Sequence, residues 1–332
     1  MNQLGAGIAI TGSGSAKPET ALDNHQLSQM VETSDQWIQA RTGIRERRIA
    51  EAQVSLSTIA AKAGQQACQM ARIAPTDLDM IILATSTPDD LFGSAGQIQA
   101  ILEAPRAVAF DLTAACSGFV FGLVTAAQFI RTGAYRNILL IGADVLSRWL
   151  DWSDRTTCVL FGDGAGAVVL QANPRDHLLG FELRTDGSQN SCLQLAYNAH
   201  SIEIVKGVTV GQGCYQAITM NGKEVYRFVV QKVPEVIDKA LFRANLSPQE
   251  VDWLILHQAN QRILDAVAQR LDISEEKVLS NLAHYGNTSA ASIPLVLDEA
   301  VRQGKIKTGD LIATSGFGAG LSWGAAVFEW GK

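Results

Sequence analysis

Three polar residues in this chain stand at points where apolar segments end, and the first of them suits nucleophilic chemistry. Cys116 lies in the sequence AFDLTAACSGF, between an apolar segment and a long helical pattern. A side chain at such a strand–turn–helix junction lies where α/β proteins bind ligands, and a helix N-terminus favours a thiolate. Cys116 is therefore a candidate nucleophile, with a buried and inert cysteine as the alternative.

The other two residues are His257 and Asn287. His257 ends the apolar segment 253–256, and Asn287 lies in the sequence HYGNTSAA before another helical pattern. Taken singly, His257 fits a satisfied core residue and Asn287 fits a helix N-cap. Asn287, however, follows Cys116 by 171 positions and occupies the equivalent place in an internal repeat. Three polar groups at corresponding points of a duplicated fold indicate one shared site.

The internal repeat divides the chain into two similar halves. Two helix–turn–strand segments recur in order, which a duplicated α/β fold explains better than chance. The repeat predicts a boundary near residue 172 and two domains, residues 1–172 with Cys116 and residues 173–332 with His257 and Asn287. The matching segments are residues 71–83 and 244–256. Within them Pro75 aligns with Pro248, and Asp79 aligns with Asp252.

Short apolar runs alternate with longer helical patterns, which predicts an α/β fold with strands buried on both faces. The expected strands are residues 8–11, 80–85, 107–112, 138–142, 167–170, 253–256, 311–314 and 325–329. The expected helices are residues 56–71, 117–131, 225–243, 261–271 and 290–302.

Composition and charge exclude several classes of protein. The chain has 332 residues, of which 47% are hydrophobic and 18% charged, as in a folded globular protein. The net charge of −6 argues against nucleic-acid binding, and the scattered cysteines and histidines against a metal site. The sequence contains no apolar run long enough for a membrane span, and residues 1–14 lack a signal-peptide pattern. A cytoplasmic protein with reduced thiols is expected.

Cys116, His257 and Asn287 resemble the catalytic triad of the β-ketoacyl-[acyl-carrier-protein] synthase III family, which has a thiolase-like fold. The resemblance covers nearly the whole chain and implies a homodimer whose two duplicated α/β halves form a layered α-β-α-β-α core. The motifs that carry it are TSDQWI at 33–38, RTGIRERR at 41–48, FGDGAG at 161–166, HQAN at 257–260, GNTSAA at 286–291 and GFGAG at 316–320.

The resemblance implies that the chain initiates type II fatty acid synthesis by decarboxylative Claisen condensation. An acyl-CoA primer would acylate Cys116, and malonyl-[acyl-carrier-protein] would then condense with the acyl group. The products would be 3-oxoacyl-[acyl-carrier-protein], CO2 and coenzyme A. His257 and Asn287 would stabilise the enolate, and the backbone N–H groups of Cys116 and Ala319 would form a second oxyanion hole. Coenzyme A is a substrate in this scheme, and no cofactor or metal is expected.

The resemblance also implies contacts with coenzyme A. Trp37 and Arg155 would stack on either side of the adenine. Arg41 would contact a phosphate, and Gly222 and Asn260 would contact the pantetheine arm.

Two further assignments concern the carrier protein and the primer. Arg262 would receive the acidic carrier protein, because a basic spot at the tunnel mouth complements an acidic partner. Phe92 would close the acyl pocket and make acetyl-CoA the best primer, unless it is an ordinary core residue. The whole expected carrier-protein contact is Gln258, Ala259, Asn260, Gln261 and Arg262.

Alternatives within the same fold differ in their reactive residues. A thiolase carries a second reactive cysteine in its last glycine loop, which here reads SGFGAG at 315–320 and contains none. A secondary-metabolite ketosynthase III-like acyltransferase is the alternative function, although Asn287 favours decarboxylative condensation. A non-catalytic binding protein does not explain the complete triad, and a papain-like hydrolase does not explain the duplicated α/β pattern.

Overall fold

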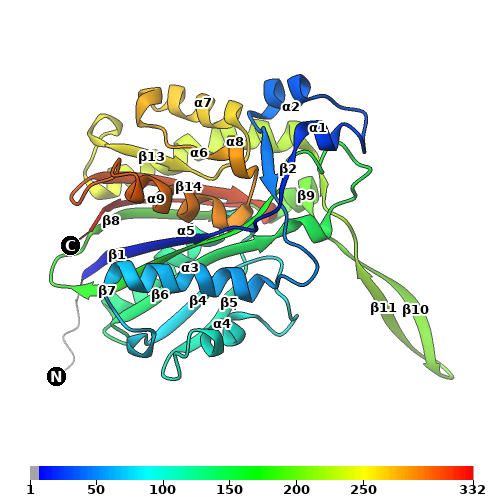
Figure 1. The fold of residues 1–332 in the computed structure, drawn as a ribbon, viewed down its shortest axis with the longest axis horizontal. Helices are drawn as coiled ribbons and strands as arrows, with labels where there is room; N and C mark the ends of the chain where they lie inside the picture. The colour runs from blue at the N-terminus through cyan, green and yellow to red at the C-terminus, as the bar shows by residue number, and fades with distance from the viewer. Residues whose placement is uncertain (1–6, 332) are drawn as a thin grey trace.

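The computed structural model describes residues 7–331 and contains one large sheet in each half of the chain (Figure 1). Residues 1–6, where no signal peptide is expected, lie outside the described residues. The five-stranded sheet has the order β1-β7-β6-β4-β5, from β1 (Gly7–Ala16), β4 (Met80–Ala84), β5 (Val108–Leu112), β6 (Asn137–Val145) and β7 (Asp163–Asn173). The four-stranded sheet has the order β13-β14-β15-β8, from β8 (Leu178–Thr185), β13 (Trp253–Leu256), β14 (Leu311–Gly318) and β15 (Ser322–Glu329).

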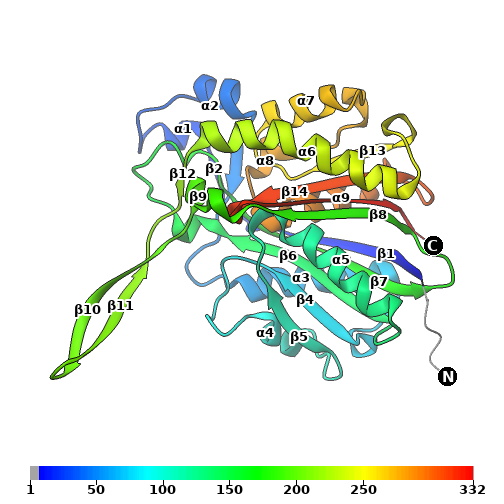
Figure 2. The ribbon, with the colours of Figure 1, turned by 180° about the vertical axis from the view of Figure 1, so that it is seen from behind.

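Helices form three layers around the two sheets (Figures 1 and 2). One pair covers the outer face of the five-stranded sheet, one pair lies between the sheets, and one pair covers the outer face of the four-stranded sheet. In that order the pairs are α3 (Leu56–Ala71) with α4 (Ala95–Ile101), α5 (Gly118–Arg131) with α9 (Ser292–Arg302), and α6 (Gly222–Ala244) with α7 (Gln261–Arg270). The predicted α-β-α-β-α layering is confirmed.

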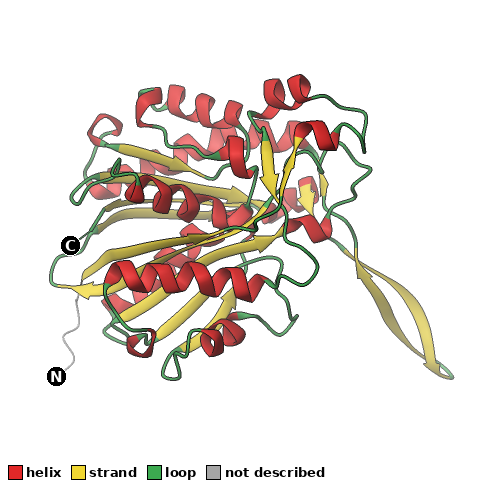
Figure 3. Ribbon diagram, viewed as in Figure 1, coloured by secondary structure: helices red, strands yellow, loops and turns green. Residues whose placement is uncertain are grey.

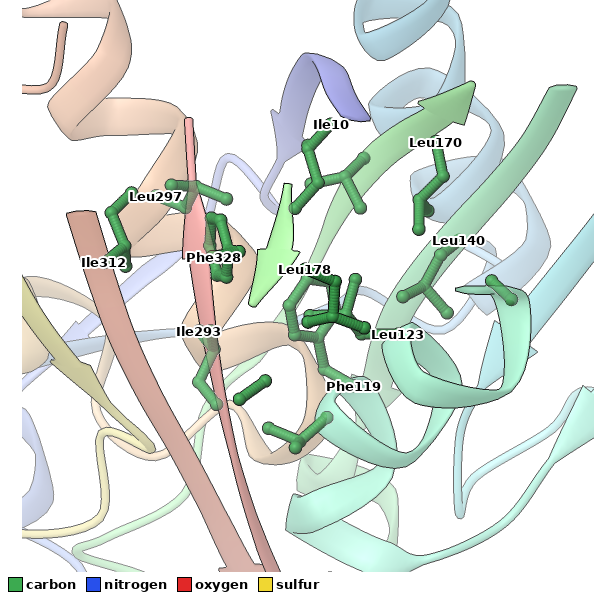
Figure 4. Packing of buried hydrophobic residues seen from close by; sticks show 14 of the residues in the cluster. Ile10, Phe119, Leu123, Leu140, Leu170, Leu178, Ile293, Leu297, Ile312 and Phe328 are labelled. Carbon is green, nitrogen blue, oxygen red and sulfur yellow. The ribbon is translucent and has the colours of Figure 1, made fainter. Parts of the chain in front are cut away.

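The central layer joins the two halves through one apolar core (Figure 4). Phe119 and Leu123 of α5 and Ile293 of α9 are buried there against Leu140 of one sheet and Phe328 of the other. A fully buried side chain of this size contributes roughly 1.5–3 kcal/mol. The halves therefore share a core, and separating them would expose it.

The sequence repeat has a structural counterpart at two aspartates. A turn of 3-10 helix containing proline precedes both β4 and β13. The Asp79 carboxylate accepts the Asn137 N–H at 2.9 Å, and the Asp252 carboxylate accepts the Leu311 N–H at 2.8 Å. Each aspartate thus ties the start of one strand to the start of the neighbouring parallel strand.

The predicted core strands and helices are present, and most of the strands are longer than expected. Several other helices and strands were not predicted. β8 is one of them, because Gly180 and Glu182 interrupt its apolar pattern. The others are α4 and the elements β2 (Ala21–Asp23), α1 (Asn24–Leu27), α2 (Asp35–Thr42), β3 (Glu46–Arg48), β9 (Leu193–Gln194), β10 (Tyr197–Val205), β11 (Val208–Tyr215), β12 (Thr219–Met220) and α8 (Leu282–Tyr285). Figure 3 shows the β10–β11 hairpin projecting from the layered body. Among residues 7–331, none of the helices has the length and apolarity to cross a membrane.

Candidate active site

Cys116 lies in a 3-10 turn, η2 (Ala115–Ser117), between β5 and α5. Its side chain is 7% exposed, and burial raises the pKa of the thiol to about 12. Desolvation of the sulfur thus opposes the thiolate that a helix N-terminus favours.

The backbone of the last glycine loop lies against Cys116. A Cβ on Gly318 would come within 2.7 Å of the Cys116 nitrogen, so only glycine fits this approach. Ala319 follows directly and starts η8 (Ala319–Leu321), but Gly318 and not Ala319 is a wall of the cavity in front of Cys116. The oxyanion-hole role of the Ala319 N–H stays a prediction.

His257 follows the end of β13 and is 1% exposed. Its backbone N–H donates to the Ser315 carbonyl at 2.9 Å. Its imidazole ring packs edge-on against the Phe317 ring, with the ring centroids 4.9 Å apart. Burial lowers the pKa of the imidazole to about 3, so His257 is neutral at physiological pH. A neutral imidazole donates from one nitrogen only, and its tautomer matters.

The hydroxyl of Ser292 faces the ring nitrogen Nδ1. Ser292 Oγ lies 2.7 Å from His257 Nδ1 and also accepts the Gln258 N–H at 3.3 Å. A serine hydroxyl that accepts one hydrogen bond can still donate or accept at Nδ1. When it donates to Nδ1, the ring proton lies on Nε2, which is the tautomer that a donor to substrate requires.

Asn287 is held from two sides. Its backbone N–H donates to the Leu160 carbonyl at 2.9 Å, and its carbonyl accepts the Gly162 N–H at 3.0 Å. Its side-chain Oδ1 accepts the Ser289 N–H at 2.9 Å. This bond occupies the oxygen end of the amide, which leaves the Nδ2 hydrogens for a ligand.

Cys116, His257 and Asn287 line one cavity of about 130 Å³ whose other walls are largely apolar. A second cavity of about 590 Å³ shares Met220 and Gly222 with it and is lined further out by Trp37. The two cavities are thus neighbours, one at Cys116 and the other at Trp37. In this enclosed site, hydrogen-bond donors stabilise a developing anion more strongly than in water.

Comparison with known proteins identifies the family. Residues 110–187 match the family described as 3-oxoacyl-[acyl-carrier-protein (ACP)] synthase III, and residues 241–330 match its C-terminal part. The chain is 70% identical to the β-ketoacyl-[acyl-carrier-protein] synthase III of Trichormus variabilis, over 98% of this chain and 99% of that protein. The chain belongs to this synthase III family. It is an acyltransferase-type condensing enzyme.

Solved structures agree with this assignment. The 3-oxoacyl-[acyl-carrier-protein] synthase III of Aquifex aeolicus VF5 superposes with a TM-score of 0.90 at 43% identity, covering 98% of this chain and 100% of that one. The priming β-ketosynthase of the R1128 polyketide pathway has the same TM-score, 0.90, at 31% identity, covering 99% and 97% of the chains. The thiolase-like fold expected of the synthase is confirmed.

Three of the five expected coenzyme A contacts, Trp37, Arg155 and Gly222, line the outer cavity, and Asn260 lines the inner one. The Arg155 guanidinium carbon lies 5.6 Å from the Trp37 ring centroid, whereas a flat ring between two stacked groups needs about 7 Å. The expected stacking of adenine between them would therefore require Arg155 to move outward from its bond to the Glu32 carbonyl. Arg41 also lies over Trp37, at 5.9 Å.

The expected carrier-protein contact is wrong at Gln258. This side chain is fully buried, where it donates to the Leu256 carbonyl at 2.7 Å and accepts from Ser280 at 2.8 Å. Arg262 is exposed, and its guanidinium donates to the Ala40 carbonyl at 2.8 Å. The remaining members are Ala259 and Asn260, which line the inner cavity, and Gln261, which is half-buried.

Phe92 does not close the acyl pocket of its own chain. Its side chain is 99% exposed, and it is not among the residues that line the cavity at Cys116. The loop turns outward there: the Phe92 N–H donates to Asp90, and Gly93 has a φ of +105°. The expected position within one chain is therefore wrong.

Sequence reasoning missed three residues behind the triad: Asp144, Ser289 and Ser292. All are at most 2% exposed. Asp144 gave a usable signal, because a carboxylate inside the apolar strand β6 is costly to bury without partners. The two serines lie in the motif GNTSAAS, and which groups they face depends on distant strands.

Proposed function

We propose that this synthase condenses an acyl-CoA primer, acetyl-CoA foremost, with malonyl-[acyl-carrier-protein] through an acyl group on Cys116. The reaction initiates type II fatty acid synthesis and yields 3-oxoacyl-[acyl-carrier-protein], coenzyme A and CO2. The observation that carries the assignment of residues is the meeting of Cys116, His257 and Asn287 in one buried cavity.

In the first half-reaction the Cys116 sulfur attacks the thioester carbonyl of the primer. The oxyanion that forms accepts hydrogen bonds from the backbone N–H groups of Cys116 and Ala319. The carbon–sulfur bond to coenzyme A then breaks, and coenzyme A leaves as the thiol, with the proton that the Cys116 thiol gives up as its sulfur bonds to the acyl carbon. Cysteine suits this step because sulfur is a strong nucleophile and the thioester it forms stays reactive.

In the second half-reaction the malonyl thioester loses CO2 and becomes an enolate. Its oxygen accepts hydrogen bonds from His257 Nε2–H and Asn287 Nδ2–H, the two donors left by Ser292 and Ser289. The enolate carbon attacks the acyl group, a carbon–carbon bond forms, and the Cys116 sulfur leaves as a thiolate that takes a proton from water. A neutral His257 suits this role because it donates without giving up its proton.

Neither half-reaction calls for a resident cofactor. The thioester supplies the activated acyl group, and loss of CO2 supplies the carbon nucleophile. Coenzyme A enters through the outer cavity past Trp37 and Arg155, and the carrier protein docks at the exposed Arg262, two residues after Asn260 of the inner cavity. A cytoplasmic location fits the five free cysteines of the chain.

We also propose that the synthase works as a homodimer paired along β5. This strand is an edge of the five-stranded sheet, and its Val108 is 48% exposed. Leu91 and Phe92, 78% and 99% exposed, precede Gly93, which lies against Asp111 of β5. Unpaired edges beside exposed apolar side chains favour pairing with another chain. Phe92 would then shorten the acyl pocket of the partner subunit.

Two measurements test this part of the proposal. Light scattering should give twice the mass of the chain, and Phe92→Thr should admit longer or branched primers. A monomeric active enzyme, or a wild type that prefers primers of six carbons or more, would contradict it.

The second candidate function is that of a secondary-metabolite ketosynthase III-like acyltransferase, and the sequence identities disfavour it. The chain is 70% identical to a named synthase III but 31% identical to the polyketide priming enzyme. A panel of acyl-CoA primers and of amine or hydroxyl acceptors separates the two. Carbon–carbon bond formation only with malonyl-[acyl-carrier-protein] is the expected result.

The main test measures the two half-reactions separately in variants of Cys116, His257 and Asn287. Each variant is incubated with acetyl-CoA, and the mass of the intact protein is measured. CO2 release from malonyl-[acyl-carrier-protein] is followed in a second assay. His257→Ala should slow CO2 release more than acetylation. The opposite result would reverse the assigned roles.

A further inference from the structure

Next to the segment that carries Asn287 lies a buried arginine that the proposed reaction does not yet use. Arg47 belongs to β3, and its side chain is 0% exposed. Its guanidinium donates to the Leu22 carbonyl at 3.0 Å, to Asn24 Oδ1 at 2.9 Å and to the Val159 carbonyl at 2.7 Å. These three acceptors are neutral, although a buried charge is costly without an opposite charge beside it. Fold stability alone is therefore a poor reason for an arginine at this position.

One end of the guanidinium holds the backbone that fixes Asn287. Nη2 of Arg47 donates to Val159, and the next carbonyl, that of Leu160, accepts the Asn287 N–H at 2.9 Å. Two residues further on, the Gly162 N–H donates to the Asn287 carbonyl at 3.0 Å. The two segments thus pair in parallel around Asn287. A displacement of the Val159 carbonyl would be passed on to Asn287 through these backbone bonds.

The stem of Arg47 packs against both paired segments. A Cβ on Gly162 would lie 3.0 Å from the Arg47 Cβ, and a Cβ on Gly286 would lie 3.3 Å from the same atom. Gly286, the residue before Asn287, also has a φ of +63°, which favours glycine. The side chain of Arg47 is therefore in close contact with the backbone on either side of the site, as well as bonded to it.

The other end of the guanidinium is tied to the helix of the outer cavity. Asn24 accepts from Arg47 through Oδ1 and donates through Nδ2 to Asp35 at 2.9 Å. Asp35 is the first residue of α2, the helix that places Trp37 at the outer cavity. Val159, at the opposite end of the fork, lines the same cavity. Arg47 thus joins the wall of the outer cavity to the segment that holds Asn287.

This arrangement needs the shape of arginine and not only its charge. The planar guanidinium donates in fixed directions from two terminal nitrogens, whereas lysine has one nitrogen on a flexible stem. Arg47 uses the two nitrogens to hold three separate segments, at residues 22, 24 and 159. Its Nε makes no hydrogen bond within residues 7–331, and a buried donor without a partner is rare. The orientation of the fork is therefore kept even though one donor is left unsatisfied.

We propose that Arg47 is a positioning residue for the enolate step, which holds the Asn287 amide in place relative to the outer cavity. An oxyanion donor is effective only within a narrow range of distances from the developing charge, so a small shift of Asn287 slows that step. The hydrogen bonds of Arg47 do not reach η2, which carries Cys116, so acylation does not depend on it. The inference rests on the proposed role of Asn287 in stabilising the enolate.

The first test compares Arg47→Lys with wild type in the two separate assays. With saturating malonyl-[acyl-carrier-protein], CO2 release should slow by about 10²-fold, the cost of misplacing a catalytic group by roughly 1 Å. Acetylation of Cys116 at saturating acetyl-CoA should stay unchanged. The matched control is Arg131→Lys, because Arg131 also bridges segments, donating to Asp176 at 2.8 Å and to the Leu178 carbonyl at 2.8 Å. This control should leave both half-reactions unchanged.

A double-mutant cycle separates positioning from general support of the fold. In an Asn287→Ala background, Arg47→Lys should slow CO2 release no further, because the amide that it positions is already absent. Asn24→Ala, which removes one acceptor of the guanidinium, should slow CO2 release in the same direction but by less. If Arg47→Lys does not fold, Asn24→Ala decides by the same comparisons.

Three results would overturn the proposal. They are CO2 release at the wild-type rate in Arg47→Lys, equal slowing of acetylation and CO2 release, and the same slowing by Arg47→Lys with and without the Asn287 side chain. CO2 release at the wild-type rate in Asn287→Ala itself would instead overturn the proposed function.

Discussion

The turn that carries Cys116 and the turn that carries Asn287 occupy the same place in the two halves of the molecule. Each contains a short 3-10 segment before a central-layer helix, and each includes a residue of positive φ, Ala115 at 48° and Ser289 at 52°. The difference is in how the functional side chain is held. The sulfur of Cys116 faces open cavity, whereas the amide of Asn287 has its oxygen fixed by the Ser289 N–H. One scaffold thus supplies a bond-forming group and a charge-stabilising group.

The residues at the ends of the equivalent strands β4 and β13 differ in size for a steric reason. His257 follows β13, and the equivalent position in the first half is Ala84, the last residue of β4. A Cβ on Gly118, at the start of α5, would lie 3.2 Å from the Ala84 Cβ. A larger side chain at residue 84 would collide with the helix that positions the nucleophile. The site therefore has one histidine because its counterpart must stay small.

Removing the bond-forming group, Cys116, is expected to have the largest effect on activity. Cys116→Ala should abolish acetylation, because no other group holds the acyl chain. CO2 release should persist, since His257 and Asn287 remain. Intact-mass measurement after acetyl-CoA, together with CO2 release, checks both expectations. Loss of both activities in a folded variant would show that the two halves do not act separately.

The second effect concerns the charge-stabilising half. Asn287→Ala should slow CO2 release by about 10²–10³-fold, the value of one preorganised oxyanion donor. Asn287→Asp should be at least as slow, because a carboxylate repels the enolate. Acetylation of Cys116 should survive in both variants. A faster Asn287→Asp than Asn287→Ala would contradict the donor role.

The third effect is the cost of burying His257. Burial lowers its pKa from 6.5 to about 3, so between these values the unfolded chain binds a proton that the folded chain does not. Stability is therefore lost as the pH falls through this range, by about 1.4 kcal/mol per pH unit.

Urea unfolding at pH 6 and pH 5 tests this cost. The slope should be smaller in His257→Gln, which has no titrating group. His284→Gln, at an exposed histidine, is the control and should keep the wild-type slope. Equal slopes for all three proteins would contradict a neutral His257.

The smallest effect is expected outside both turns. Arg262→Ala should raise the KM for malonyl-[acyl-carrier-protein] and leave acetylation unchanged, because rim charges act mainly on association. Added salt should reproduce the change in wild type. Steady-state kinetics with each substrate checks this, and equal losses for both substrates would count against docking at Arg262.

The sequence predicted those parts of the molecule that follow from local pattern and repetition. Cys116 and Asn287 were found because the repeat aligns them, and the layered fold followed from the family resemblance. The carrier-protein contact predicted at Gln258 was wrong because a motif of adjacent residues does not show which of them face inward. Phe92 was misplaced because the local sequence does not show that its loop turns outward. Asp144 was missed because its partners come from residues 85–87 and 290.

The pairing of β1 with β7 has a consequence for how the protein is made. Ile8 and Ile10 pair with residues 170–172, which leave the ribosome some 160 residues later. At about 5–20 residues per second, the first strand waits roughly 8–30 seconds for its partner. During that time an apolar strand with unpaired backbone groups is exposed to other nascent chains. We therefore expect chaperones that shield apolar strands to raise the yield of folded protein during synthesis.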